Sequence, residues 1–321
     1  MMRSLRFLLP LLVAMPLACA GRPGPEPRPS VAAADDTAWV RDIVDGSRDL
    51  TVNLHPKKLS HDPIYGPLVR KASRLAAGES RSSYLGSTTL EVLEQSDEVL
   101  LAVRSSRPLD AVVIVSGVPA GVDVEKVRDD DGRSPWKDAT RMPNGLLALS
   151  SREGNPPGTL YVVGERTWVL GVGPAAERVR ERLVERGGRS MPRAPATLAP
   201  SGNQKDVPLS IKLQGELLDS LRGVARSGLR PIFDQLSYVR LALASGDQGN
   251  LEAVFLYEQD KAAERASGRA QELITIVPEK ISPNLAFLRN ATIQRSGRSV
   301  QVTAKLPSQL LRGLADAEKE E

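Results

Sequence analysis

The sequence predicts an α+β protein made of two tandem, weakly similar halves, each a mainly antiparallel sheet covered by helices. Three observations lead to this fold class. Short segments that alternate between apolar and polar residues, typical of half-buried strands, recur in the same order on either side of residues 187–206. Each half contains one pair of apolar runs joined by turn residues. Helix-like segments lie between these strands in both halves.

Each half begins with a predicted strand and a predicted helix. Asp49–Leu54 (DLTVNL) and Pro208–Leu213 (PLSIKL) alternate between apolar and polar residues, which indicates a strand with one buried face. A helix-like segment follows each strand, Ile64–Ala77 in the first half and Glu216–Phe233 in the second. We therefore expect the order strand–helix twice.

A hairpin comes next in each half. In the first half, Val99–Val103 (VLLAV) leads through polar turn residues into Leu109–Val115 (LDAVVIV). In the second half, Val239–Leu243 (VRLAL) leads in the same way into Leu251–Leu256 (LEAVFL). Two apolar runs separated by turn residues predict a pair of antiparallel strands.

Each half is expected to end with a helix, two strands and a last helix. Proline suits the first turn of a helix, where its missing N–H would have no partner, so Pro174 and Pro307 mark helix starts. Between Gly78 and Leu90 the first half carries extra Ser/Thr-rich sequence without a counterpart. The assigned elements are helices Val122–Val127 and Asp260–Ile274, strands Arg166–Val172 and Arg298–Leu306, and helices Pro174–Glu185 and Pro307–Ala317.

The N-terminus has the pattern of an export signal. Arg3 and Arg6 supply positive charge, and an apolar stretch follows over Phe7–Val13. The signal ends in the short run Leu17–Gly21, which contains Cys19, the only cysteine of the chain. The apolar stretch is too short to remain as a membrane-spanning helix.

This segment resembles the bacterial lipoprotein signal, in which a leucine and small residues end at a cysteine. The resemblance implies that Cys19 is diacylated and becomes the first residue of the mature chain, so that the protein is held at a membrane by its lipid. Pro16 departs from the pattern, because leucine usually occupies that position and here follows it as Leu17. Ala20 rather than aspartate follows the cysteine, and by analogy with other lipoproteins this favours the outer membrane.

A second interpretation uses the same residues. Ala18–Ala20 fits the small-x-small site of an ordinary secretory signal, which would release a soluble periplasmic or secreted protein beginning at Gly21. In either case a chain whose only cysteine is Cys19 forms no internal disulfide, although export would permit one.

Changes in composition divide the chain into segments. Gly21–Pro29 alternates proline, glycine and charged residues, a composition that stays extended and buries little surface. Gly187–Asp206 is rich in glycine, proline and serine, as linkers are. The predicted segments are a signal peptide (1–18), a flexible tether (19–34), a first α+β domain (35–186), a linker (187–206) and a second α+β domain (207–321).

The charge balance argues against nucleic-acid binding. The chain has 43 Lys and Arg against 39 Asp and Glu. Since the predicted signal peptide contains two arginines and no acidic residue, the net charge of +4 falls to about +2 in the mature protein. A nucleic-acid-binding protein is expected to have a clear excess of basic residues gathered on one face.

The two histidines of the chain, His55 and His61, limit its catalytic chemistry, because a Ser-His-Asp triad would have to use one of them. Together with Asp62 they could form a two-His-one-carboxylate metal site. Their spacing matches no common zinc pattern, and two lysines lie between them. We therefore interpret them as surface residues of a proline-bounded turn.

Two further motifs resemble ligand-binding loops. Gly171–Ala176 has the G-x-G-x-x-A form of a dinucleotide loop and lies between a predicted strand and helix, but no second strand with a ribose-binding acid follows. Asp129–Gly132 with Asp138 partly resembles a calcium loop that lacks its first ligand. We interpret the former as a tight strand-to-helix turn and the latter as a polar loop anchored by Trp136, and we expect neither a metal ion nor a cofactor.

Two classes of function remain. The first is a lipid-anchored, non-catalytic cell-envelope protein that binds an envelope protein or a small ligand. The alternative is a secreted or periplasmic enzyme whose site uses carboxylates or serine without histidine. No carboxylate pair stands at a predicted strand end, which favours the binding protein.

Overall fold

The computed structural model describes residues 48–62, 65–66, 92–128, 132–142, 145–152, 157–163, 166–185, 209–225, 228–244, 249–280, 287 and 289–307. These residues belong to two compact units that meet in the sequence between Leu209 and Ser210. The second domain was expected to begin close to this point, at residue 207.

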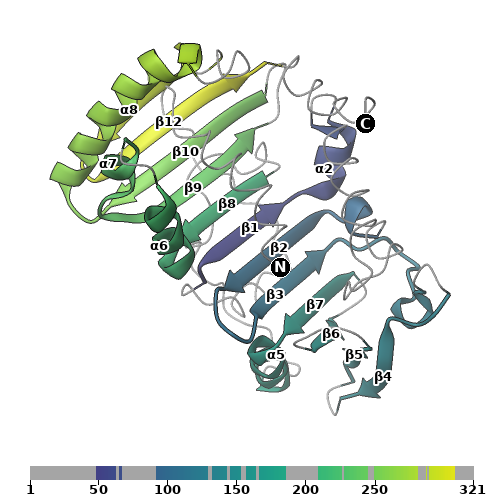
Figure 1. Ribbon diagram of the computed structural model, residues 1–321. Coiled ribbons are helices and arrows are strands. Elements are labelled where there is room, and N and C mark those ends of the chain that lie inside the picture. Colours follow the sequence, from purple (N-terminus) through teal and green to yellow (C-terminus); the bar gives the residue numbers. More distant parts are fainter. Residues whose placement is uncertain are drawn as a thin grey trace. The chain divides into compact units, whose positions relative to one another are not determined.

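The N-terminal unit contains a sheet in the order β1-β2-β3-β7-β6-β5-β4 (Figure 1). All neighbouring strands in this series run antiparallel. Its strands are β1 (Leu50–Leu54), β2 (Glu98–Arg104), β3 (Asp110–Ser116), β4 (Trp136–Arg141), β5 (Leu147–Ser151), β6 (Gly158–Val162) and β7 (Thr167–Val172). Its helical segments are α2 (Pro56–His61), the 3₁₀ turn η2 (Val124–Lys126) and α5 (Pro174–Glu185).

This sheet has an apolar core on each face. On one face, α5 packs Ala175, Val179 and Leu183 against side chains of the central strands such as Val112 and Val169. The other face gathers a second cluster that includes Val99, Val115, Leu170, Trp136 and Trp168. Because β7 lies inside the sheet between β3 and β6, every one of its residues is buried. This two-sided burial explains its nearly continuous apolar sequence.

The C-terminal unit contains strands in the order β11-β12-β10-β9-β8 (Figure 1). The pairs β9–β10, β10–β12 and β11–β12 are antiparallel. Its strands are β8 (Leu209–Gln214), β9 (Leu236–Ala244), β10 (Gly249–Tyr257), β11 (Thr292–Ser296) and β12 (Ser299–Leu306), and its helices are α6 (Gly215–Val224), α7 (Arg230–Phe233) and α8 (Asp260–Lys280).

The long helix α8 covers one face of this second sheet. Along β10, buried and half-buried residues alternate strictly, as expected for a strand with one face against a core. The facing side of α8 presents small residues, including Ala262, Ala263, Ala266 and Ala270, all of them buried. Small side chains let the helix approach the strands closely, while Phe255 and Val302 fill the layer between them.

The α+β class and the antiparallel pairing of strands are confirmed. Both predicted hairpins form, with Val99 opposite Val115 in the first unit and Leu243 opposite Leu251 in the second. The strands predicted at 49–54, 166–172, 208–213 and 298–306 and the helix at 174–185 are present within a residue at each end. The helix predicted from Asp260 is also present and extends to Lys280.

Other predictions need correction. The helix expected over Glu216–Phe233 is divided into α6 and α7, because Ala225 adopts an extended backbone and Pro231 lies in the first turn of a new helix. The helix expected over Val122–Val127 is reduced to one 3₁₀ turn. Three strands, β4 to β6, occupy the region where a single unassigned strand was expected. The segments 67–91 and 308–317, which include predicted helices and the Ser/Thr-rich insertion, lie outside the described residues.

Candidate functional site

The two histidines flank a short helix where the sequence predicted a turn. His55 precedes α2 and His61 is its last residue. Pro56 occupies the first turn, and the Leu59 N–H donates to the His55 carbonyl at 3.0 Å, which closes the first helical bond. Proline is common both in turns and at the first position of a helix, so Pro56 did not distinguish a turn from a helix in the sequence.

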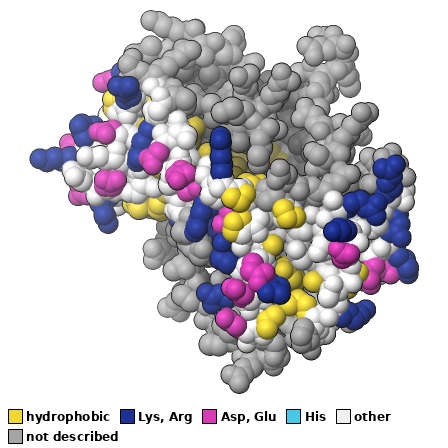
Figure 2. Space-filling view, turned by 60° about the horizontal axis from the view of Figure 1, so that its bottom comes forward, with side chains coloured by type: hydrophobic (Ala, Val, Ile, Leu, Met, Phe, Trp, Pro, Cys, Tyr) yellow, Lys and Arg dark blue, Asp and Glu magenta, His cyan; other side chains and the backbone are white. Residues whose placement is uncertain are grey.

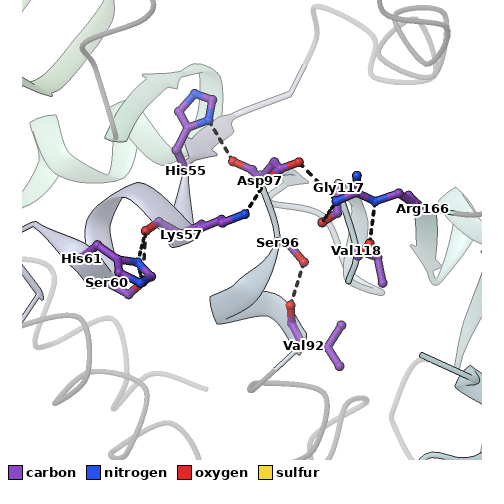
Figure 3. Close-up of polar contacts among 10 residues, drawn as sticks. All are labelled: His55, Lys57, Ser60, His61, Val92, Ser96, Asp97, Gly117, Val118 and Arg166. Atoms are coloured by element: carbon purple, nitrogen blue, oxygen red, sulfur yellow. Dashed lines mark hydrogen bonds and ion pairs between the residues drawn. The ribbon is translucent and has the colours of Figure 1, made fainter. Parts of the chain in front are cut away.

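The rings of the two histidines bind different backbone carbonyls (Figure 3). His55 Nδ1 lies 3.0 Å from the Asp97 carbonyl oxygen, and His61 Nδ1 lies 2.7 Å from that of Lys57. Since a carbonyl only accepts hydrogen bonds, Nδ1 carries the proton in both rings. Among the residues that the structure describes, no three His, Cys, Asp or Glu side chains group as a metal site requires.

Ser60 beside His61 does not have the geometry of an activated nucleophile. The Ser60 hydroxyl lies 3.2 Å from His61 Nδ1 and also donates to the Lys57 carbonyl at 3.2 Å. A general base must offer an unprotonated nitrogen to the hydroxyl, but Nδ1 already donates its proton to Lys57. This serine and histidine therefore cap the end of α2.

Asp97 is the centre of a polar cluster at one end of the first sheet (Figure 3). Lys57 Nζ lies 3.7 Å from one carboxylate oxygen, and Arg166 Nη2 lies 3.6 Å from the other. Arg166 also donates from Nε to the Val118 carbonyl at 2.9 Å and from Nη2 to the Gly117 carbonyl at 3.2 Å. The cluster thus joins α2, the start of β2, the end of β3 and the start of β7.

The exposure of this cluster indicates a structural role. The side chains of Lys57, Asp97 and Arg166 are 60%, 54% and 53% exposed, so water weakens their ion pairs. Backbone bonds reinforce the same connections, with the Lys57 N–H donating to the Ser96 carbonyl at 3.2 Å. The cluster therefore holds three chain turns together around Asp97.

The Gly171–Ala176 motif is a tight strand-to-helix turn, as predicted. A Cβ on Gly171 would lie 2.6 Å from the Cα and 2.9 Å from the amide nitrogen of Ala176, so glycine is needed for α5 to rest against β7. Gly173 has a positive φ of 62°, which favours glycine, and its N–H donates to the Pro157 carbonyl at 3.0 Å. The Tyr161 hydroxyl donates to the Ala176 carbonyl at 2.9 Å and closes the turn.

Only part of the motif that resembles a calcium loop lies within the described residues. Residues 129–131 lie outside the described residues. Asp138, the acidic residue of the motif beyond the loop, belongs to β4 and is paired with Ser150 of β5. Trp136 is buried and its indole N–H donates to the Val124 carbonyl at 2.9 Å, which confirms the predicted anchoring role.

A buried charge cluster that the sequence did not predict lies at the other end of the first sheet. The Asp110 carboxylate accepts hydrogen bonds from Arg48 at 2.7 Å and from Arg178 at 2.6 Å to each of its oxygens. The side chains of Arg48 and Asp110 are 1% and 3% exposed, whereas Arg178 on α5 is 40% exposed. The cluster ties the residues before β1 to β3 and α5.

Charge and burial act in opposite directions on the pKa of Asp110. Burial is the largest single influence and raises the pKa. Hydrogen bonds and charge from Arg178 and Arg48 lower the pKa and together outweigh burial, so the net pKa of the carboxyl lies below its ordinary value. Asp110 is therefore ionised at neutral pH, which suits a fixed ion pair and not a proton-transferring group.

A pocket of about 540 Å³ lies in the C-terminal unit, where α6, α7 and α8 come together. We name it the arginine pocket, after the three arginines that line it together with one carboxylate. Its lining residues are Arg222, Gly223, Arg230, Pro231, Phe233, Asp234 and Arg265.

Contacts to backbone fix the walls of the arginine pocket. Arg222 donates from Nε to the Phe233 carbonyl at 3.0 Å, and its other nitrogens contact the Leu236 carbonyl and Asp219. From α8, Arg269 Nε donates to the Gly228 carbonyl at 2.9 Å. These bonds hold α7 from both sides, so the shape of the pocket is set by the protein's own hydrogen bonds.

Little in the sequence pointed to this pocket. Its residues come from three separate helices, and the notable signal was a run of arginines from 222 to 230 that also fits an exposed helix face. Charges elsewhere are mixed, since Lys and Arg lie among Asp and Glu over much of the face shown in Figure 2. Cys19, the tether and the linker at 187–206 lie outside the described residues.

Within the described part of the chain, no helix has both the length and the apolar character needed to cross a membrane.

Comparisons with known proteins give a likeness in fold. The sequence matches no protein-family model and no curated protein. Crystal form IV of TP0453 is similar with a TM-score of 0.50 and 12% identity, over 85% of this chain and 95% of that chain. Crystal form I gives a TM-score of 0.50 and 11% identity, over 89% and 98%. At such low identity the likeness concerns the fold alone, and the chain is similar in fold to TP0453.

Proposed function

We propose that this chain is a lipid-anchored, non-catalytic protein of the bacterial cell envelope that binds an envelope protein or a small ligand. The observation that carries the proposal is the position of Cys19. The only cysteine of 321 residues stands where an apolar export signal ends and a proline-rich segment begins. A buried structural thiol would have no reason to occur at that point, whereas lipid attachment requires it there.

The residues after Cys19 fit a tether. Gly21–Pro29 has a composition that remains extended in water, at roughly 3 Å per residue. Such a segment would let the folded units stand some tens of ångströms away from the membrane surface. Ala20 beside the cysteine supports the outer membrane as the destination.

The binding role is supported by the character of the described polar groups. The best-buried carboxylate, Asp110, is held in ion pairs, and the Ser60–His61 contact lacks an available base. The arginine pocket offers a preformed concave surface lined mainly by basic groups, without the convergent acids that a carboxylate-pair enzyme uses.

We also propose that the two halves arose by duplication. The strand order β1-β2-β3-β7-β6 of the first unit corresponds to the order β8-β9-β10-β12-β11 of the second. In both orders the first three strands follow one another along the chain. The last strand of the half, β7 or β12, then lies next to the third strand, and the strand that comes just before it in the chain, β6 or β11, lies on its other side. The strands β4 and β5 and the long helix α8 are where the halves differ.

Two such modules are expected to fold independently. Residues 35–186 and 207–321, produced separately, should each unfold cooperatively, and failure of both segments to fold would contradict the proposed duplication.

The anchor is tested by intact mass spectrometry of the native protein. We expect a mature chain that begins at Cys19 and carries added acyl mass, together with metabolic labelling by palmitate. Cys19→Ala should abolish labelling and release the protein from membranes. Ala20→Asp is the matched control, because it keeps the cysteine and should keep the lipid while it moves the protein toward the inner membrane. A mature chain that begins at Gly21 without acyl mass would contradict the proposal.

A further inference from the structure

We propose that the arginine pocket binds the carboxylate or phosphate group of a small organic anion. This inference rests on the proposed binding role and gives it a place and a ligand chemistry. Its volume of about 540 Å³ lies within the range of pockets that hold small molecules.

The lining charges favour an anion. Three guanidinium groups and one carboxylate line the pocket, which leaves an excess of positive charge. The carboxylate, Asp234, is 3.5 Å from Arg265, and both side chains are more than half exposed, so this ion pair is weak. Arg230 is exposed and has no ion-pair partner among the residues that the structure describes. Arg230 and Arg265 can therefore both turn donors toward a ligand.

The arrangement of the third arginine makes the pocket rigid. Arg222 uses Nε and Nη2 for the carbonyls of Phe233 and Leu236, and its side chain is only 33% exposed. The Tyr257 hydroxyl donates to the Ile232 carbonyl at 2.9 Å and supports α7 from beneath. A ligand that enters would not have to order this wall, which lowers the cost of binding.

The remaining lining residues indicate an organic ligand rather than a simple ion. Pro231 and Phe233 give the pocket an apolar side next to the guanidinium groups. A planar guanidinium group pairs well with carboxylate and phosphate oxygens through two parallel hydrogen bonds. The fitting ligand therefore has one oxyanion group attached to a small apolar body.

The test is calorimetric titration of the native mature protein with phenyl phosphate, benzoate and benzyl alcohol. We expect the two anions to bind more weakly as salt is added and the neutral alcohol not to bind. Arg230→Gln and Arg265→Gln should each weaken anion binding by about tenfold. Arg295→Gln is the matched control, because Arg295 is exposed on β11 of the same unit and does not line the pocket.

Each outcome decides the inference. Loss of affinity in the two pocket variants alone, with thermal midpoints equal to that of Arg295→Gln, supports it. It is overturned by absence of anion binding, by equal binding of benzyl alcohol, or by affinity that Arg230→Gln and Arg265→Gln leave unchanged. A chain that carries acyl mass but does not bind these anions would refute the pocket's role and leave the membrane anchor standing.

Discussion

Arg48 and Asp110, 62 residues apart in the sequence, form a buried ion pair in which Nη1 lies 2.7 Å from the carboxylate oxygen. Neither side chain is more than 3% exposed. Two charges removed from water in this way are stable only when they are paired and hydrogen-bonded to each other, and Arg178 donates a further hydrogen bond to the carboxylate.

Asp110→Asn is therefore expected to destabilise the N-terminal unit strongly. The substitution leaves the Arg48 charge buried without its counter-charge, at a cost of about 3–5 kcal/mol in the free energy of unfolding. Asp123→Asn is the matched control, because Asp123 pairs with Lys126 at 2.9 Å on the surface. Denaturant titration should show a much smaller shift for the control, because water screens an exposed ion pair. Equal shifts for both variants would show that burial of the pair is unimportant.

The same carboxylate predicts how stability depends on pH. The folded-state pKa of Asp110 lies below its ordinary value of about 4, so its stabilising contribution is complete above that pH and is lost as the pH falls through the folded-state pKa. Thermal midpoints measured from neutral pH downward should fall for the wild type below about pH 4. The fall should be shallower in Asp110→Asn, which has no group to titrate at that position. Parallel curves for the two proteins would contradict this assignment.

Gly117→Ala is expected to destabilise the turn after β3 for two reasons. The residue has a φ of +71°, and an added Cβ would overlap the Asp97 carboxylate and lie 2.5 Å from the Asp97 Cβ. Gly121→Ala is the matched control, because Gly121 has a φ of +83° and a Cβ added there would have no described atom within 4 Å. The control should cost about 1–2 kcal/mol through the backbone alone. Gly117→Ala should cost more, and Asp97→Gly in the same chain should recover part of the difference in the unfolding free energy.

Gly171→Ala should weaken the packing of α5 on β7. Its Cβ would meet backbone atoms of Ala176 at 2.6 Å, and backbone cannot turn aside as a flexible side chain can. A cost of about 1–3 kcal/mol is expected from this overpacking. Gly268→Ala gives the opposite sign, since Gly268 is exposed in α8, its added Cβ would have no described atom within 4 Å, and alanine favours helix by up to about 1 kcal/mol. Thermal unfolding of both variants measures the contrast.

The strands that could be predicted from the sequence are those whose burial leaves an apolar pattern, either alternating or nearly continuous. Leu251–Leu256 alternates because its side chains point in turn to the core and away from it, whereas Arg166–Val172 is nearly continuously apolar because β7 is buried on both faces. In contrast, β4 is exposed at every residue after Trp136, so nothing in its sequence required alternation. The short strands β5 and β6 contain Ser150, Ser151, Gly158 and Thr159, residue types that are also common in loops.

The sites were harder to predict because they depend on distant residues. The Asp97 cluster and the Arg48–Asp110 pair each join segments that only the folded sheet brings together. Local signals were informative where the chemistry is local, as in the Gly171 turn and the Trp136 anchor. Neither type of signal identifies a ligand, which is why the chemistry of the arginine pocket emerges only from the fold.

The different roles of the pocket arginines have an evolutionary consequence. Arg222 uses its donors on carbonyls that shape the wall, so its loss would disturb folding as well as charge. Arg230 and Arg265 lie at the exposed side of the pocket and can be exchanged for neutral or acidic residues on an intact scaffold. Descendants of this chain could thus drift in ligand preference, even to cations, without a new architecture.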